Sequence, residues 1–214
     1  MGLAQRWHFL RGCLQRPAVV GAVAPSSQAL AAALCDPFRR HPRPAAVLEV
    51  GAGTGAVTRH IGSLLGERDR LDICEINSVF AGVIRKKILT RPDFRPAVSA
   101  GRVRLVETAV QNLARAEHYD FIISGLPLTA FELRDVKEVL RVLRHSLKPG
   151  GVLSYFEYVG VRRTTRLLSV GRGRERIRLV SELLSDTIRR HQVEQRTVLK
   201  NLPPARARHL RFDR

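Results

Sequence analysis

Short apolar runs alternate with longer amphipathic segments along most of the chain. The apolar runs lack the strict alternation of a half-exposed strand, which is typical of parallel strands buried on both faces. They are Ala46–Val50, Leu71–Cys74, Val103–Val106, Phe121–Ile123 and Val152–Phe156. Helical spacing marks the segments between them, which are Ala56–Leu65, Val79–Thr90 and Glu132–Leu147. This order predicts a doubly wound α/β fold with a right-handed crossover after each strand.

The C-terminal part of the chain breaks this alternation. Lys148-Pro-Gly-Gly151 is predicted to end a helix and form a turn before the fifth strand. A helix near Glu175–Arg190 precedes two strand-like runs, Val193–Lys200 and Arg206–Phe212, which are joined through Asn201-Leu-Pro-Pro204. Because the connection is short, we expect an antiparallel hairpin at one edge of a seven-stranded, mostly parallel sheet.

Composition adds a full-sized core and a strong positive charge to this pattern. The 214 residues are 44% hydrophobic, which suffices for a folded domain. Lys and Arg number 37 against 19 Asp and Glu, so the formal net charge is +18. Such a surface attracts dense phosphate. Nucleic acid and an anionic membrane leaflet are therefore the candidate partners, and charge alone does not separate them.

The sequence favours a location in the reducing cytoplasm. Cys13, Cys35 and Cys74 are far apart and lack metal-binding spacing, so we expect neither a disulfide nor a metal site. No apolar stretch approaches the roughly 18 residues of a membrane span. Polar residues also interrupt the N-terminal run where a signal peptide needs an apolar core. We expect a cytoplasmic protein that associates peripherally with a membrane.

Three glycines follow the first predicted strand at alternate positions, in Val47-Leu-Glu-Val-Gly-Ala-Gly-Thr-Gly55. Residues without Cβ let the backbone pass close to a flat or anionic ligand. The spacing differs from the G-x-G-x-x-G of dinucleotide sites, and no Walker A lysine follows. Glu75 ends the second strand about twenty residues later, where a carboxylate can accept both hydroxyls of a ribose. The glycines and the carboxylate together predict a ribose-containing ligand.

Residues 45–158 resemble the class I S-adenosylmethionine-dependent methyltransferases, whose first motif is similar to Glu49–Gly55. The resemblance implies S-adenosylmethionine as cofactor, with Glu49 near its amino-acid end and Glu75 on its ribose. Many members read the adenine amine with an Asp after the third strand. Thr108 stands in that place, so adenine recognition is expected to rest on backbone groups. The implied cofactor-binding residues are Glu49, Gly51, Gly53, Gly55, Glu75, Ile76, Thr108, Ala109 and Ser124.

The fourth predicted strand ends in Ser124-Gly-Leu-Pro127, a turn that favours an amine acceptor. A nitrogen nucleophile must aim its lone pair at the sulfonium methyl, so acceptors from this turn would hold the hydrogens of the amine. The predicted catalytic residues are Ser124, Gly125, Leu126 and Pro127. The alternative is that Pro127 only forms the turn and that the turn has no role in binding the acceptor.

Two methyltransferase families have a turn that resembles this one. Ribosomal RNA adenine dimethylases carry a version similar to Asn-Leu-Pro-Tyr, whereas bacterial phospholipid N-methyltransferases carry Ser-Gly-Leu-Pro. Val20–Ser27 and Asn201–Ala205 also resemble segments of the second family. That resemblance implies N-methylation of phosphatidylethanolamine or a related aminolipid. An RNA adenine N6-methyltransferase and a catalytically silent membrane- or RNA-binding protein are the alternatives.

A stretch rich in proline and arginine, Pro37–Pro44, separates a predicted N-terminal helical arm, residues 1–44, from a predicted methyltransferase domain, residues 45–214. In helical conformation the arm carries a narrow apolar stripe flanked by arginine, which is typical of a helix in a lipid headgroup layer. The predicted membrane-binding residues are Leu3, Trp7, Leu10, Arg11 and Leu14. A lid over the cofactor is the alternative. Pro25–Ser27 is predicted to begin a helix.

Aromatic and arginine side chains follow one another after the fifth predicted strand. Tyr158 and Arg162 are predicted to contact the substrate headgroup, because an ammonium favours an aromatic face and a phosphate favours a guanidinium. Strand alternation places Phe156 and Tyr158 on one face of the sheet. An aromatic core strand, an RNA-binding arginine run and a solvated face are the alternatives.

Overall fold

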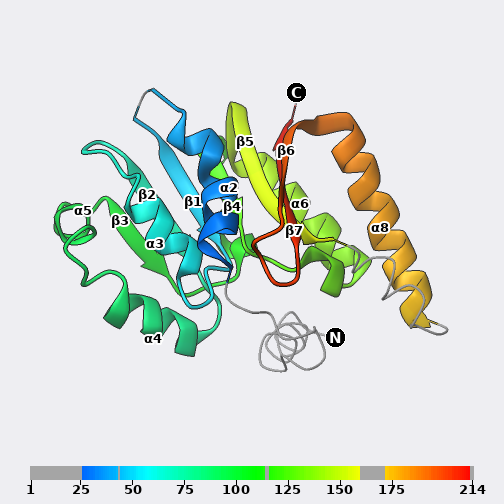
Figure 1. Cartoon of the computed structure of the whole chain (residues 1–214), viewed down its shortest axis with the longest axis horizontal. Helices are drawn as coiled ribbons and strands as arrows, with labels where there is room; N and C mark the ends of the chain where they lie inside the picture. The colour runs from blue at the N-terminus through cyan, green and yellow to red at the C-terminus, as the bar shows by residue number, and fades with distance from the viewer. Residues whose placement is uncertain (1–25, 43, 114–115, 160–171, 213–214) are drawn as a thin grey trace.

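The computed structural model describes residues 26–42, 44–113, 116–159 and 172–212. Within them, seven strands form one sheet in the order β3-β2-β1-β4-β5-β7-β6, with helices on both faces (Figure 1). The strands are β1 (Ala46–Val50), β2 (Arg70–Cys74), β3 (Val103–Val106), β4 (Tyr119–Ser124), β5 (Leu147–Tyr158), β6 (Gln192–Val198) and β7 (Ala205–Arg211). The helices are α2 (Gln28–Arg39), α3 (Ala56–Gly62), α4 (Ser78–Lys87), α5 (Arg95–Ser99), α6 (Leu133–Ser146) and α8 (Arg172–His191), with short 3-10 turns η1 (Val110–Leu113) and η2 (Leu128–Ala130). The predicted doubly wound fold is confirmed.

The parallel strands bring their carboxyl ends together at one edge of the sheet. Val50, the last residue of β1, pairs with Cys74 of β2 and with Ser124 of β4. Strand β7 runs antiparallel to both β5 and β6, so the predicted C-terminal hairpin is also confirmed. The loops that follow β1, β2 and β4 therefore lie side by side, where α/β sheets bind their ligands.

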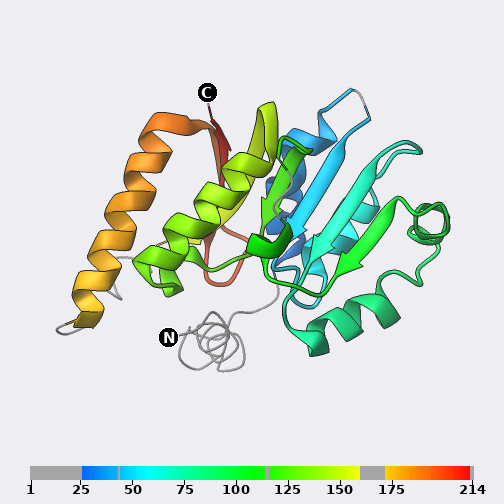
Figure 2. The same ribbon diagram turned by 180° about the vertical axis from the view of Figure 1, so that it is seen from behind.

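Two hydrophobic cores lie on opposite faces of this sheet. Helices α2 to α5 cover one face, and α6 and α8 cover the other (Figure 2). Successive residues of β1 alternate between them: Val47 belongs to the first core and Leu48 to the second. In α6, Val136, Val139 and Leu143 are buried at helical spacing. Burial on both faces explains why the strands read as continuous apolar runs.

Helix α2 is part of the folded domain. The Ser27 hydroxyl accepts the backbone N–H of Leu30 at 3.2 Å, which confirms the predicted helix start. Leu30 and Leu34 are fully buried in the same core as the sheet. Residues 28–39, which fall within the predicted arm 1–44, thus pack against the sheet. The division at residue 44 stays a prediction, and residues 1–25 lie outside the described part.

Element boundaries differ from the predicted ones at β5. The predicted turn Lys148–Gly151 lies inside a longer strand that already begins at Leu147. The β4–β5 register shifts between the pairs Tyr119–Leu147 and Phe121–Val152, so the extra residues form a bulge. Gly150 has φ +75°, the left-handed conformation that a bulge glycine often adopts. The turn chemistry was recognised correctly, but it interrupts a ladder and does not precede one.

Candidate functional site

The glycine loop, Gly51–Gly55, leaves β1 through three left-handed residues. The φ angles of Gly51, Gly53 and Gly55 are +70°, +57° and +82°. A Cβ on Gly51 would lie 2.7 Å from Leu126 Cδ2, and one on Gly55 would lie 2.9 Å from Ile88 Cγ1. A Cβ on Gly53 would meet no atom within 4 Å. Packing therefore requires the outer two glycines, whereas Gly53 borders open space that a ligand can enter.

Glu75, just beyond β2, ties the glycine loop to the neighbouring strand. Its Oε2 accepts the N–H of Gly53 at 2.7 Å, and its Oε1 accepts the N–H of Asn77 at 2.8 Å. Burial raises the pKa of Glu75, although these N–H groups act in the opposite direction. The backbone N–H of Ile76 also acts on this carboxylate. A carboxylate offers about four lone-pair positions, so Glu75 shapes the loop and keeps acceptor capacity for a ribose hydroxyl.

Glu49, in β1, is a buried carboxylate without a hydrogen-bond partner among the described residues. Its side chain is 1% exposed, and neither Oε1 nor Oε2 receives a hydrogen bond. Burial raises the pKa of Glu49 to about 8. The nearby hydroxyl and backbone N–H of Thr58 act in the opposite direction, and the charge of Glu75 acts in the same direction as burial. Buried polar groups in native proteins are nearly always paired. The unpaired carboxylate therefore fits a cationic group brought by a ligand, such as the ammonium of an amino acid.

A narrow cavity of about 60 Å³ lies beside the loop, at the carboxyl ends of β1, β2 and β4. Its floor is apolar, with Phe131 and Val139. The predicted residues that line it are Gly51, Gly53, Glu75, Ile76, Thr108, Ala109, Gly125, Leu126 and Pro127. Glu49, Gly55 and Ser124 do not line it. The structure thus brings the motifs after β1, β2, β3 and β4 to one small space.

Gln111 is a wall residue of this cavity that the sequence analysis missed. Its Oε1 is buried without a partner. Thr108 is engaged in its own loop, because its Oγ1 accepts from Asn112 Nδ2 at 3.1 Å and its carbonyl accepts from Cys74 Sγ at 3.2 Å. The carboxamide of Gln111 is therefore a candidate acceptor for an adenine amine, in addition to backbone groups. A carboxamide in the first turn after the third strand was the available signal, but it belongs to no motif.

The Ser124–Pro127 turn packs directly against the glycine loop. Ser124 is fully buried, and its Oγ accepts the N–H of Leu126 at 3.3 Å. A Cβ on Gly125 would lie 2.5 Å from the carbonyl oxygen of Gly51, which explains the glycine. Ser124 therefore fixes the shape of the turn, and Gly125, Leu126 and Pro127 face the cavity.

Tyr158 lies at the end of β5, on the α2 face of the sheet. Its ring contacts Phe156 edge-to-face at 5.2 Å between centroids, which confirms that the two share a face. Because Ser124 pairs with Tyr155, Tyr158 lies three residues further along the strand, or about 10 Å. Half-burial raises the pKa of Tyr158, so the hydroxyl stays neutral at physiological pH. Arg162 and the predicted membrane-binding residues lie outside the described part.

Among the residues that the structure describes, no three His, Cys, Asp or Glu side chains are grouped to hold a metal ion. No helix in the same residues is both long and apolar enough to cross a bilayer. Cys35 and Cys74 are buried free thiols, and burial raises the pKa of Cys74 to about 12.

The part of the chain that carries this site matches a known protein family. Residues 48–153 match the family described as methyltransferase domain. This part of the chain is a class I S-adenosylmethionine-dependent methyltransferase domain. S-adenosylmethionine is accordingly its cofactor. The residues present fit this cofactor. The Glu49 carboxylate suits its ammonium, and the open space at Gly53 lets it lie close to the backbone. Glu75 suits its ribose and the Gln111 carboxamide suits its adenine.

Curated relatives of the methyltransferase domain act on different acceptors. An ornithine lipid N-methyltransferase from Singulisphaera acidiphila is 32% identical over 108 residues, which are 50% of this chain and 55% of that protein. The ubiquinone/menaquinone biosynthesis C-methyltransferase UbiE of Azotobacter vinelandii is 33% identical over 116 residues, covering 52% of this chain and 42% of that protein. The match thus spans about half the length of these relatives.

Solved structures share the fold of the methyltransferase domain at low identity. The 1,6-didemethyltoxoflavin-N1-methyltransferase of Burkholderia thailandensis, solved with S-adenosylhomocysteine, has a TM-score of 0.61 and 19% identity, and the match covers 98% of this chain and 88% of that one. A putative caffeoyl-CoA O-methyltransferase from Staphylococcus aureus also scores 0.61, at 14% identity, covering 94% of this chain and 91% of that one. At these identities the likeness shows the fold alone.

Proposed function

We propose that the protein N-methylates the headgroup amine of phosphatidylethanolamine or a related aminolipid at a membrane surface. The observation that carries this proposal is the packing of the Ser124–Pro127 turn against the glycine loop, with Gly125 against Gly51. That contact puts carbonyl acceptors beside the cofactor site. The ornithine lipid N-methyltransferase among the relatives supports an aminolipid acceptor.

The turn would orient the amine. S-adenosylmethionine, when bound, supplies an electrophilic sulfonium methyl. The carbonyls of Leu126 and Pro127 each accept one backbone N–H within the turn, from Leu128 at 2.9 Å and from Ala130 at 2.8 Å. Each keeps a second lone pair for an amine hydrogen. Two such acceptors fix the direction of the nitrogen lone pair, and orientation is the main contribution that this reaction needs.

The amine must lose a proton before it can attack, because an ammonium has no lone pair. Among the described side chains that line the cavity, none is a histidine or a lysine, and the two carboxylates there are those of Glu75 and Asp135. We assign Glu75 to the ribose, and Asp135 is the side chain to test as a base. Water or the lipid phosphate would take the proton, and activity would rise toward alkaline pH. Tyr158, neutral at the end of β5, and the predicted contact Arg162 would hold the ammonium and the phosphate of the headgroup.

A second candidate function is C-methylation of a lipophilic acceptor, which the UbiE relatives favour. The charge of +18 weighs toward an acceptor embedded in phosphate-rich surroundings. RNA offers phosphate too, so an RNA adenine acceptor belongs in the same experiment.

An acceptor panel tests the proposal. The protein is incubated with methyl-labelled S-adenosylmethionine and, in parallel, with vesicles containing phosphatidylethanolamine, with quinone precursors and with ribosomal RNA. We expect label in the aminolipid fraction, increasing between pH 7 and pH 9. If label appears only in the quinone or only in the RNA, the proposed acceptor is wrong, and the assignment to the methyltransferase family still holds.

A further inference from the structure

The turn of the β6–β7 hairpin, residues 199–204, inverts the usual distribution of polarity. Leu199 and Leu202 are 76% and 82% exposed, more than any other large hydrophobic side chain of the described residues. Asn201 between them is only 4% exposed. Its Oδ1 accepts the N–H of Ser27 at 3.0 Å, and its Nδ2 donates to the carbonyl of Pro203 at 2.8 Å. The buried amide fixes the turn, and the two leucines project into solvent.

This turn lies at the same edge of the sheet as the cofactor site. Tyr158, near the end of β5, pairs with Ala205 at the start of β7, and the N–H of Val159 donates to the carbonyl of Pro204 at 2.8 Å. Val159 is itself 45% exposed. Figure 1 shows the turn at the lower end of the sheet, near the loops that follow β1 and β2. The exposed apolar residues therefore border the expected acceptor site.

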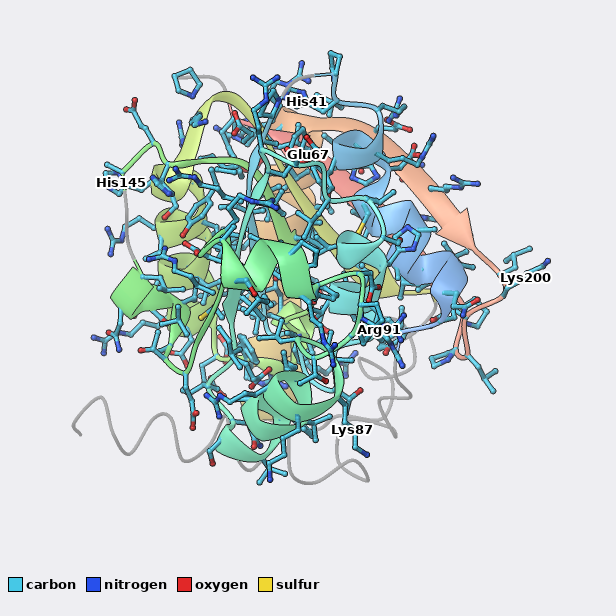
Figure 3. All side chains as sticks on the ribbon, turned by 90° about the vertical axis from the view of Figure 1, so that its left-hand side faces the viewer. His41, Glu67, Lys87, Arg91, His145 and Lys200 are labelled. Carbon is cyan, nitrogen blue, oxygen red and sulfur yellow. The ribbon has the colours of Figure 1, made fainter. Side chains whose placement is uncertain are left out.

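Cationic residues flank the apolar turn in the sequence, and of these Lys200 lies in the turn itself. From Gln195 to Phe212 the sequence contains no Asp or Glu. The cations of this stretch near the turn are Arg196, Lys200 and Arg206, whereas Arg208 is paired with Glu157 and Arg211 lies at the far end of β7. Lys200, between the two leucines, is exposed and stands at the outer margin of the molecule (Figure 3). Apolar side chains beside cations suit a lipid headgroup layer, which offers acyl chains below and phosphate at the same depth as the cations. A nucleic-acid backbone offers only the phosphate.

We propose that Leu199 and Leu202 insert into the surface of an anionic bilayer and hold the acceptor site against it. The role of this contact, which is to bring the acceptor site to its lipid, rests on the proposed aminolipid methylation. The contact itself is independent of the predicted membrane-binding residues of the N-terminal arm.

Quenching by brominated lipid tests insertion directly. The single tryptophan, Trp7, is first replaced by phenylalanine, and Leu202→Trp then places the only indole on the turn. With vesicles of phosphatidylglycerol and phosphatidylethanolamine carrying brominated acyl chains, we expect strong quenching and a blue shift. Val193→Trp in the same background is the matched control. Val193 is also exposed but lies at the other end of β6, about 20 Å away, and its indole should stay unquenched.

Affinity gives a second readout. Leu199→Ser/Leu202→Ser should weaken vesicle binding about a hundredfold, because each buried leucine contributes roughly a factor of ten. Val193→Ser should bind as the unmodified protein does. Calorimetric titration with S-adenosylmethionine should give the same affinity for all three proteins, which shows that the double variant is folded.

The outcomes separate this proposal from the proposed function. Failure of the unmodified protein to bind vesicles, an unquenched Leu202→Trp indole on bound protein, or equal binding by the double-serine variant would each overturn the docking. If the indole is quenched but the unmodified protein methylates RNA or quinone and no aminolipid, the docking stands and the proposed function falls. If aminolipid is methylated while the turn stays outside the bilayer, only the docking falls.

Discussion

The two halves of the sheet are held together by different kinds of contact. In the cofactor half, around β1 and β2, Glu75 bonds to Gly53, 22 residues away, and to Asn77, 2 residues away. In the half proposed to hold the acceptor, here called the acceptor half and formed by β5, β7 and β6, the turn of the hairpin is fixed by Asn201 and Ser27, which are 174 residues apart. The cofactor half is thus built from short motifs, whereas the acceptor half is assembled from distant segments.

This difference indicates which half of the sheet we expect to determine specificity for the methyl acceptor. The cofactor half can remain the same among enzymes with different acceptors, because its groups are local and complete. The acceptor half combines β5, the start of α2 and the hairpin, so under our proposal changes in any of them would alter the surroundings of the acceptor. Relatives that share the matched half of this chain accordingly include both an N- and a C-methyltransferase by name.

The largest effect is expected from Gly53→Val. The new side chain enters the open space beside the loop, so S-adenosylmethionine binding should be abolished in calorimetric titration. The matched control is Gly101→Val, since Gly101 also has a left-handed φ, of +65°, and no atom within 4 Å of a Cβ. Both variants should lose about 1–2 kcal/mol of stability from backbone strain. Unchanged cofactor affinity in folded Gly53→Val protein would remove this loop from the cofactor site.

A smaller effect is expected from Gln111→Leu, which keeps the size of the side chain but removes the acceptor. Loss of one hydrogen bond of about 1–1.5 kcal/mol should lower cofactor affinity roughly tenfold. The analogue with hypoxanthine in place of adenine lacks the amine and supplies the control. The unmodified protein should bind that analogue about as weakly as Gln111→Leu binds either ligand. Equal losses for both ligands in the variant would assign Gln111 to packing.

Glu49 should couple cofactor binding to proton release. Its pKa is raised to about 8, so the carboxyl is largely protonated at pH 7 without cofactor. The ammonium of the cofactor favours the ionised form, and binding at pH 7 should release about one proton. Calorimetry in buffers of different ionisation enthalpy measures this number. Glu49→Gln should abolish the release, and equal release by both proteins would place the titrating group elsewhere.

The same raised pKa predicts how stability varies with pH. A carboxyl whose folded-state pKa lies above its unfolded value stabilises the fold below the unfolded pKa and loses this contribution as pH rises toward the folded one. Stability of the cofactor-free protein should therefore fall between about pH 5 and pH 8. Thermal unfolding of Glu49→Gln should show a flatter dependence. A matching slope in both proteins would contradict the assignment.

The smallest effect is expected in the acceptor half. If Arg162 contacts the headgroup phosphate, as we propose, Arg162→Ala should raise the apparent KM for aminolipid several-fold and leave cofactor affinity unchanged. Steady-state assays with varied lipid and fixed saturating cofactor measure the change. If Arg162→Ala lowers only the affinity for the cofactor, Arg162 contacts the cofactor and the proposed contact to the headgroup is wrong.

Sequence reasoning succeeded where structure is set by local chemistry. The glycine loop, Glu75 and the Ser124–Pro127 turn lie at strand ends, and hydrophobic periodicity locates strand ends well. It failed for Gln111, because a single carboxamide gains its meaning only from burial in a cavity wall. The bond between Asn201 and Ser27 was equally out of reach, since no periodicity relates the two segments.

The central claim is that the methyl group reaches the nitrogen of a lipid headgroup. Carbon-13 NMR with S-[¹³C-methyl]adenosylmethionine and vesicles containing phosphatidylethanolamine observes the new bond itself. The account predicts an N–¹³CH₃ resonance that remains with the lipid after extraction and is absent with Gly53→Val protein. A ¹³CH₃ bound to carbon in a quinone precursor, or to the N6 of adenine in RNA, with none on the aminolipid, would contradict it.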